Sequence, residues 1–222
     1  MIIAIDGPAA SGKSTVAKAV ARRLGMHYLD TGAMYRAVAW LALERGVPAD
    51  DAGQLAALAF AHPVTFAYED ASTLPTGVYI ADRDVTVAIR QPEVDAAVSA
   101  VASVPEVRAA MVSQQRRLAG EDDTVVEGRD IGTVVFPDAE LKVFLTASAD
   151  ERARRRRIDL VGAGHDVETN EVRERLERRD YADSTREASP LDIAEDAQRL
   201  DTTGLPVEEV VERIAILAGE RR

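Results

Sequence analysis

The chain has 222 residues and a formal net charge of −11 at pH 7, from 38 acidic and 27 basic side chains. This length suits one compound domain, and the acidic balance argues against a general nucleic-acid-binding protein, whose footprint would be basic. The absence of cysteine excludes disulfides and thiol catalysis. Because the chain has neither a bilayer-length apolar run nor a basic leader with a cleavage site, we expect a cytoplasmic protein without a membrane partner.

The first predicted strand, Ile2 to Asp6, runs into a glycine-rich turn and then a helix over Gly12 to Leu24. The turn matches GxxxxGKS, a loop whose backbone N–H groups converge on phosphate oxygens. Within it, Lys13 can reach the outer phosphates and the Ser14 hydroxyl can bind Mg²⁺. We therefore predict a nucleoside-triphosphate site that needs Mg²⁺, formed by Gly7, Pro8, Ala9, Ala10, Ser11, Gly12, Lys13, Ser14 and Thr15.

Strand and helix patterns alternate along the rest of the chain, which predicts an α/β fold with a parallel sheet covered on both faces. Further strands are expected at His27 to Leu29, Thr124 to Glu127, Leu141 to Leu145 and Ala197 to Leu200. Further helices are expected at Gly32 to Glu44, Asp51 to Ala61, Gln91 to Ala102, Pro105 to Ala119, Ala149 to Leu160, Glu168 to Asp180 and Pro206 to Ala218.

One stretch breaks this alternation. Between Pro63 and Arg90, short alternating runs such as 64–68 and 77–80 are separated by turn residues. This pattern predicts a small antiparallel sheet inserted into the larger fold.

Two polar clusters directly follow predicted strands. Asp30-Thr31-Gly32-Ala33-Met34-Tyr35-Arg36 opens a helix, and Glu127-Gly128-Arg129-Asp130 follows the third strand of the parallel sheet. Because ligands of open α/β sheets bind at the carboxyl ends of the strands, these side chains are candidates for a second ligand site. A helix cap with a solvated arginine, and a turn with an ion pair, are the ordinary alternatives.

The remaining motifs narrow the class of P-loop protein. No guanine-reading NKxD is present, and the DxxG match at 201–204 lies near the carboxyl terminus, where we expect a strand end and a helix cap. No apolar strand ends in the adjacent acids of the larger ATPases. A small kinase is what remains.

The chain resembles the cytidylate kinase family, in its bacterial form with a long insert, over nearly its whole length. The resemblance rests on IDGPAASGKST from Ile5, LDTGAMYR from Leu29, EGRDIGTVVFPDA from Glu127 and the ERAxRR pattern from Glu151. It implies transfer of a phosphoryl group from ATP to CMP or dCMP by a P-loop kinase with a three-layer α/β/α fold and a five-stranded parallel sheet. It also implies a core (1–62, 85–153 and 187–222), a substrate-binding insertion at about 63–84 and a helical lid at about 154–186.

The same resemblance implies roles for individual residues. Thr31, Tyr35 and Arg36 would lie near the acceptor nucleotide, with Ser99, Arg108 and Asp130 on the cytosine. Arg129 and Arg179 would bind phosphate, Asp183 the ribose hydroxyls, and Arg186 would lie close by. The acceptor is an anionic phosphate oxygen, so the reaction needs aligned cations rather than a general base. A carboxylate acting on the metal through water, Asp6 or Asp130, is left open.

Four adjacent arginines, 154–157, cannot all face one phosphate chain, because helical residues step by about 100°. Arg155 and Arg156 share a face with Arg152, so we expect them, with Lys13, Arg129 and Arg179, to act in catalysis. For Arg154 and Arg157 we expect a solvated stripe facing Glu171, Glu174 and Glu177.

Two alternatives stay open at this point. A kinase of another small acceptor, such as UMP or a sugar acid, would keep the P-loop without needing Ser99, Arg108 and Asp130 together. A regulatory module would bind nucleotide without turnover. We expect a monomer, since no long apolar face demands a partner.

Overall fold

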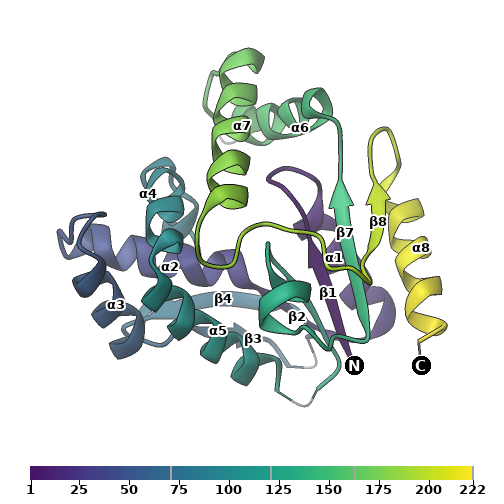
Figure 1. Cartoon of the computed structure of the whole chain (residues 1–222), viewed down its shortest axis with the longest axis horizontal. Coiled ribbons are helices and arrows are strands. Elements are labelled where there is room, and N and C mark those ends of the chain that lie inside the picture. Colours follow the sequence, from purple (N-terminus) through teal and green to yellow (C-terminus); the bar gives the residue numbers. More distant parts are fainter. Residues whose placement is uncertain (71, 121, 163, 222) are drawn as a thin grey trace.

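The computed structural model of the chain describes residues 1–70, 72–120, 122–162 and 164–221. Its centre is a five-stranded parallel sheet in the order β2-β6-β1-β7-β8 (Figure 1). The strands are β1 (Ile2–Asp6), β2 (His27–Asp30), β6 (Thr124–Glu127), β7 (Leu141–Thr146) and β8 (Gln198–Asp201). Glu127 pairs in register with Ile5 on one side and Asp30 on the other, so polar strand ends meet at one edge of the sheet.

Helices cover both faces of this sheet, as predicted. The helices of the described residues are α1 (Lys13–Leu24), α2 (Thr31–Glu44), α3 (Ala52–Ala61), α4 (Pro92–Ser103), α5 (Pro105–Ala119), α6 (Ala149–Gly162), α7 (Thr169–Thr185) and α8 (Val207–Gly219). Side chains alternate across each strand: Ile3 and Ile5 pack with α1 and α8, whereas Ala4 between them packs with the cluster that contains α2 to α5. The result is a three-layer α/β/α arrangement.

The antiparallel sheet expected between Pro63 and Arg90 is present. It contains β3 (Thr65–Tyr68), β4 (Pro75–Ile80) and the two-residue strand β5 (Arg83–Asp84). A short 3-10 helix, Ala88–Arg90, then leads into α4. Val78 and Ile80 of β4 are buried in the same apolar cluster as α2, so this sheet is anchored to the larger fold.

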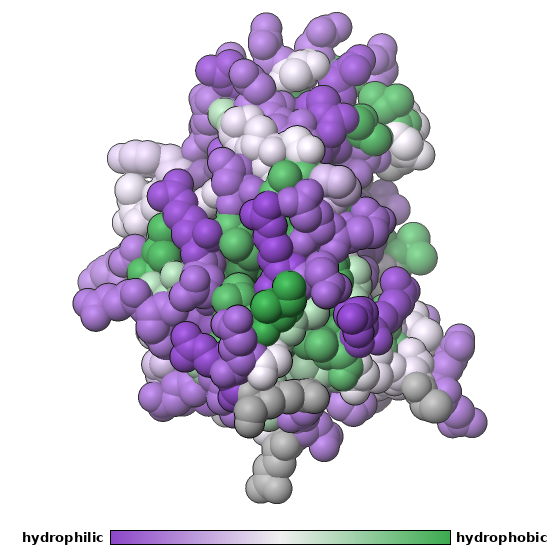
Figure 2. Space-filling view, turned by 90° about the vertical axis from the view of Figure 1, so that its right-hand side faces the viewer, coloured by the Kyte–Doolittle hydropathy of each residue, from purple (hydrophilic) through white to green (hydrophobic). Residues whose placement is uncertain are grey.

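Helices α6 and α7 pack against each other and rise above the edge where the parallel strands end (Figure 1). We call residues 149–185 the α6–α7 hairpin. Its apolar core is small: Ala153, Val172 and Leu176 are its buried members, and Ala9 of the P-loop packs with them. The upper part of the molecule in Figure 2 is accordingly mostly hydrophilic.

Two local features differ from the sequence-based expectation. Helix α7 continues to Thr185, five residues past the expected end, so Asp183 is helical. Residues Ile131–Val135 form a π-helix that no pattern predicted. Its first N–H groups, on Ile131 and Gly132, donate to the two carboxylate oxygens of Asp6 at 2.9 and 2.8 Å.

Among the described residues, no single helix is long and apolar enough to cross a membrane. In the part of the chain that the structure describes, one pair of helices, α4 and α5, reaches that length and composition together, across a 97° bend between them.

Candidate functional site

The glycine-rich loop between β1 and α1 has the backbone of a phosphate cradle. Gly7 has φ +147° and Gly12 has φ +94°, both in the region that favours glycine. A Cβ on Gly7 would lie 2.1 Å from the carbonyl oxygen of Leu145, so β7 leaves no room for a side chain there. Ala10 also has a positive φ, of 59°. The loop closes through Lys13, whose Nζ donates to the Pro8 carbonyl at 2.7 Å.

Ser14, expected to bind the metal, donates from Oγ to Oε1 of Glu127 at 2.8 Å. The same Oε1 accepts the hydroxyl of Tyr28 at 2.7 Å, and Oε2 is buried with no partner among the described residues. Hydroxyl and carboxylate oxygens are the ligands that Mg²⁺ prefers. The residues present therefore fit Mg²⁺ at Ser14 and Glu127.

Asp6 and Asp130, which the sequence leaves open as carboxylates acting on the metal through water, both have protein partners. Both oxygens of Asp6 accept backbone N–H groups of the π-helix, and Asp130 pairs with Arg108. Burial raises the pKa of Asp6 to about 6. Glu127 is the carboxylate that contacts Ser14.

Lys13 lies in a strongly charged environment. Burial and the nearby Arg129 lower the pKa of Lys13 well below its ordinary value, and Glu127 and Asp6 act in the opposite direction. Burial likewise raises the pKa of Glu127, against the charge of Lys13. Each charge thus depends on its partner across the cradle.

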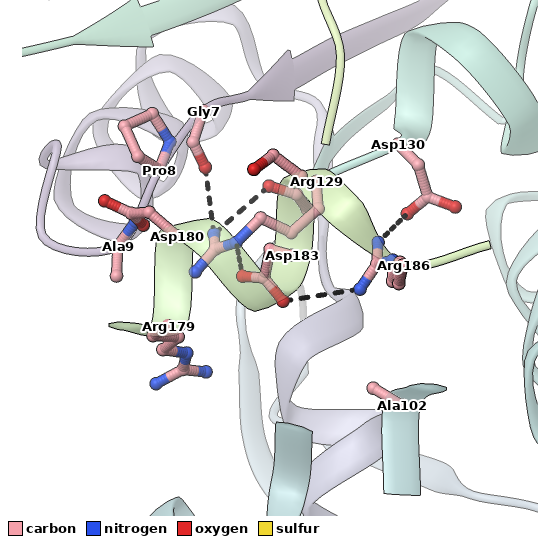
Figure 3. Close-up of polar contacts among 12 residues, drawn as sticks. Gly7, Pro8, Ala9, Ala102, Arg129, Asp130, Arg179, Asp180, Asp183 and Arg186 are labelled. Carbon is pink, nitrogen blue, oxygen red and sulfur yellow. Dashed lines mark hydrogen bonds and ion pairs between the residues drawn. The ribbon is translucent and has the colours of Figure 1, made fainter. Parts of the chain in front are cut away.

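Arg129 joins the cradle to α7 (Figure 3). Its Nη1 donates to the Gly7 carbonyl at 3.0 Å, and its Nε donates to Oδ2 of Asp183 at 2.9 Å. The second oxygen of Asp183 faces Arg186 at 3.4 Å, and Arg186 lies 4.0 Å from Asp130. Although burial opposes it, Arg129 and Arg179 hold the pKa of Asp183 below its ordinary value.

A second ion pair of the site, between Arg108 and Asp130, is almost fully buried. Arg108 on α5 donates to Oδ2 of Asp130 at 2.5 Å, with side chains 4% and 6% exposed. The guanidinium also bonds the Ala102 carbonyl at 3.1 Å and lies 5.2 Å from the centre of the Tyr35 ring. Burial raises the pKa of Tyr35 to about 12, so its hydroxyl keeps its proton. Carboxylate, guanidinium and phenol thus form one buried polar group.

The arginines of α6 divide as the helical spacing predicted. Arg155 donates to the carbonyls of Ser11 and Thr202 at 3.2 and 2.7 Å. Arg152 donates to the Ala9 carbonyl at 3.2 Å and to Asp180 of α7, which in turn accepts the Ala9 N–H at 3.1 Å. Both backbone polar groups of Ala9, its N–H and its carbonyl oxygen, are therefore held by the α6–α7 hairpin.

Arg154 and Arg157 point outward, as expected, but their partners differ from those expected. Arg154 pairs with Glu151 of its own helix, and Arg157 donates to the Val167 carbonyl. The expected partners, Glu171, Glu174 and Glu177, pair instead with Arg175, Arg178 and Arg173 of α7. Each of these is an i, i+4 pair within one helix, a spacing that brings the two side chains together without any contact across the hairpin.

Asp95 on α4 forms ion pairs with two arginines of the α6–α7 hairpin. Arg156 of α6 reaches Oδ2 at 2.8 Å, and Arg179 of α7 reaches Oδ1 at 3.1 Å. Burial opposes the effect, yet Arg179, Arg156 and Arg36 keep the pKa of Asp95 below its ordinary value. Arg36 is thus close to both Asp95 and Arg179.

The remaining residues that the sequence predicted for the site are Thr31, Ser99 and Thr15. Thr31 donates its hydroxyl to the Glu127 carbonyl at 2.7 Å, which ties the start of α2 to the end of β6. Ser99 is half-buried on α4, one turn beyond Asp95, and Thr15 is exposed on α1.

Sequence reasoning missed three acids of this site: Glu127 as partner of Ser14, Asp95, and Asp180. Glu127 carried a signal, because it ends a buried strand next to the P-loop strand. Asp95 and Asp180 resemble ordinary surface acids of charged helices, so only the fold brings them to the arginines.

A model of the cytidylate kinase family matches residues 3–220 of the chain. A cytidylate kinase of Streptococcus pneumoniae (strain 70585) is 49% identical over 219 residues, covering 99% of this chain and 97% of that protein. A bifunctional pantoate ligase/cytidylate kinase of Synechococcus sp. (strain JA-2-3B'a(2-13)) is 53% identical over 216 residues, covering 97% of this chain and 40% of that longer protein.

A solved structure of an uncharacterized protein from Eubacterium ventriosum ATCC 27560 shares the fold with a TM-score of 0.52 at 13% identity, covering 97% of this chain and 96% of that one. Together with the P-loop and the arginine-rich site above it, the family match over residues 3–220 shows that the chain belongs to the cytidylate kinase family.

Proposed function

We propose that the chain transfers the γ-phosphoryl group of ATP to CMP, and also to dCMP, giving ADP and CDP or dCDP. The family match and the near full-length relative support this reaction. The observation that carries it is Arg129, which bonds the cradle at Gly7 and the α7 carboxylate Asp183 with one guanidinium. A donor cradle and an acceptor site joined by an arginine suit phosphoryl transfer.

In this reaction the protein supplies alignment and positive charge. The attacking oxygen of CMP is already anionic at neutral pH, so no general base is required. Lys13 and the arginines 129, 155, 156 and 179 would offset the negative charge that gathers as the phosphoryl group moves. Ser14 and Glu127 would hold Mg²⁺, which would supply positive charge to offset that of the donor phosphates.

The acceptor base would be read by the buried group around Arg108. Asp130 can accept from the exocyclic amine of cytosine, and Arg108 can donate to its ring or carbonyl. Ser99, Tyr35 and Thr31 would line the same site. A site built to hydrogen-bond a base edge rejects an analogue that lacks the matching group.

We further propose the division into a core, an insertion at about 63–84 and a lid at about 154–186, and a cytoplasmic monomer with no nucleic-acid partner. On the face shown in Figure 2, hydrophobic residues are interspersed with hydrophilic ones, which supports the monomer.

An ADP-release assay with CMP, dCMP, UMP and AMP as acceptors tests the proposal. We expect turnover with CMP and dCMP well above that with UMP and AMP. Preference for UMP would favour a kinase of another acceptor. Nucleotide binding without ADP release would favour a regulatory module.

A further inference from the structure

We propose that Asp95 is a positioning residue that orients Arg156 and Arg179 toward the acceptor phosphate by holding one N–H group of each. This inference rests on the proposed function for the identity of the acceptor. It concerns a carboxylate on α4, outside the cradle and outside the residues expected to contact nucleotide.

The first observation is that Asp95 connects three helices. Its two oxygens accept separately from Arg156 of α6 and Arg179 of α7, at 2.8 and 3.1 Å. The side chain of Asp95 is 30% exposed, and those of Arg156 and Arg179 are 35% and 23% exposed. Such half-buried, charge-assisted bonds are stronger and more directional than fully exposed ones.

The second observation is that the hairpin has few other anchors on this side. Its apolar contact with the rest of the chain is the small cluster around Ala9 and Ala153, next to the P-loop. Toward α4, the hydrogen bonds found among the described residues are those that Asp95 makes. Asp95 therefore fixes the position of Arg156 and Arg179, and of the part of the α6–α7 hairpin that carries them, relative to α4.

The third observation is that these bonds leave donors free. Arg179 uses Nη1 for Asp95, while its Nε is buried with no partner among the residues that the structure describes. Arg156 uses Nη2 for Asp95. A guanidinium presents five N–H donors in a fixed fork, so holding one donor orients the others.

The charges around Asp95 indicate that it orients the arginines and does not compete with the acceptor phosphate for them. Burial lowers the pKa of Arg179, and the nearby charges of Arg129 and Arg36 lower it further. Asp95 and Asp183 are the acids that oppose this repulsion. Without Asp95, two long side chains would have to be ordered by the acceptor itself, which costs binding free energy.

The test compares Asp95→Asn with Glu93→Gln. Glu93 is exposed, lies in the same first turn of α4 and makes no ion pair with a described residue, so its variant controls for loss of a helix-terminal charge. Hydrogen exchange is measured in the full chain without nucleotide. We expect the amides of α7 to exchange several-fold faster in Asp95→Asn, with α8 unchanged in both variants.

Kinetics give the second measurement. We expect Asp95→Asn to raise KM for CMP about five- to tenfold, the cost of ordering about one arginine side chain, with kcat within about threefold and KM for ATP unchanged. Asp95→Glu keeps the carboxylate and should restore most of the affinity for CMP.

Each other outcome overturns the inference. A lower KM for CMP would mean that Asp95 competes with the acceptor phosphate. Equal exchange of the α7 amides in the Asn and Gln variants, or unchanged exchange, would show that Asp95 orients nothing. If the wild-type chain turns over no CMP, the proposed function fails, while the exchange measurement still tests the link from α4 to the hairpin.

Discussion

Removing the charge of Asp130 tests both the fold and the proposed base recognition. Asp130 and Arg108 are 6% and 4% exposed, 2.5 Å apart. Replacing Asp130 with Asn leaves a buried guanidinium without its carboxylate, which costs about 3–5 kcal/mol in comparable buried pairs. Arg108 keeps the Ala102 carbonyl and the Tyr35 ring, so we expect the lower end, about 3 kcal/mol.

A double-mutant cycle separates the pair from its surroundings. Arg108→Met should also cost about 3 kcal/mol, because it leaves Asp130 with Arg186 at 4.0 Å as its other cation. The double variant removes both charges, so its cost should again be about 3 kcal/mol, well short of the sum. Urea unfolding followed by the fluorescence of Trp40, the single tryptophan and 8% exposed, measures all four proteins.

The same variant reports on recognition. If Asp130 accepts from the cytosine amine, Asp130→Asn should reduce the preference for CMP over UMP by about 10- to 100-fold, the worth of a buried hydrogen bond to a charged group. Binding of ATP should be kept. Additive costs in the cycle would refute the argument from burial, and an unchanged preference would refute the role in base recognition.

The other predictions concern the cradle and the strand ends. Lys13→Ala should lose on the order of 3 kcal/mol of transition-state stabilisation, seen as a fall in kcat of about 100-fold, and retained turnover would contradict the role of the cradle. Glu127→Gln keeps an acceptor for Ser14 and Tyr28 but removes the charge, so kcat should fall and the Mg²⁺ concentration for half-maximal rate should rise; an unchanged Mg²⁺ titration would rule out a metal role. Because burial raises the pKa of Asp6 from 3.8 to about 6, its contribution to stability is present below about pH 4 and is lost as pH rises through about 6. Unfolding free energies should therefore fall by about 3 kcal/mol relative to Asp6→Asn between pH 4 and 7, and parallel curves would contradict this.

The sequence predicted regular elements better than contacts between charged groups. Strands such as Ile2–Asp6 have period-two or continuous apolar patterns, and helix α5 begins at Pro105, so their bounds follow from local chemistry. The pattern predicts too short a helix α7, because the last turns of this helix contain charged residues that tertiary contacts stabilise, such as Asp183 with Arg129. The π-helix at Ile131–Val135 has no sequence pattern of its own, since Asp6 stabilises it from 125 residues away.

In the candidate site, too, positions could be predicted from local sequence but contacts between charged groups could not. Side chains that directly follow a strand, such as Thr31 and Arg129, could be assigned to the sheet edge from the pattern alone. The partner of an arginine could not be assigned, because Asp95 and Glu171 look alike on a charged helix. Only their placement in space shows that Asp95 faces two arginines of the hairpin while Glu171 pairs within its own helix.

The two hydrogen bonds that hold the backbone of Ala9 matter for the design of inhibitors. Asp180 holds its N–H and Arg152 its carbonyl oxygen, so a single loop residue tethers both helices of the hairpin. A small molecule that binds in the P-loop and displaces Ala9 would also break the hydrogen bonds that hold those two helices. Selectivity over P-loop proteins that lack such a tether could then come from a contact remote from the nucleobase.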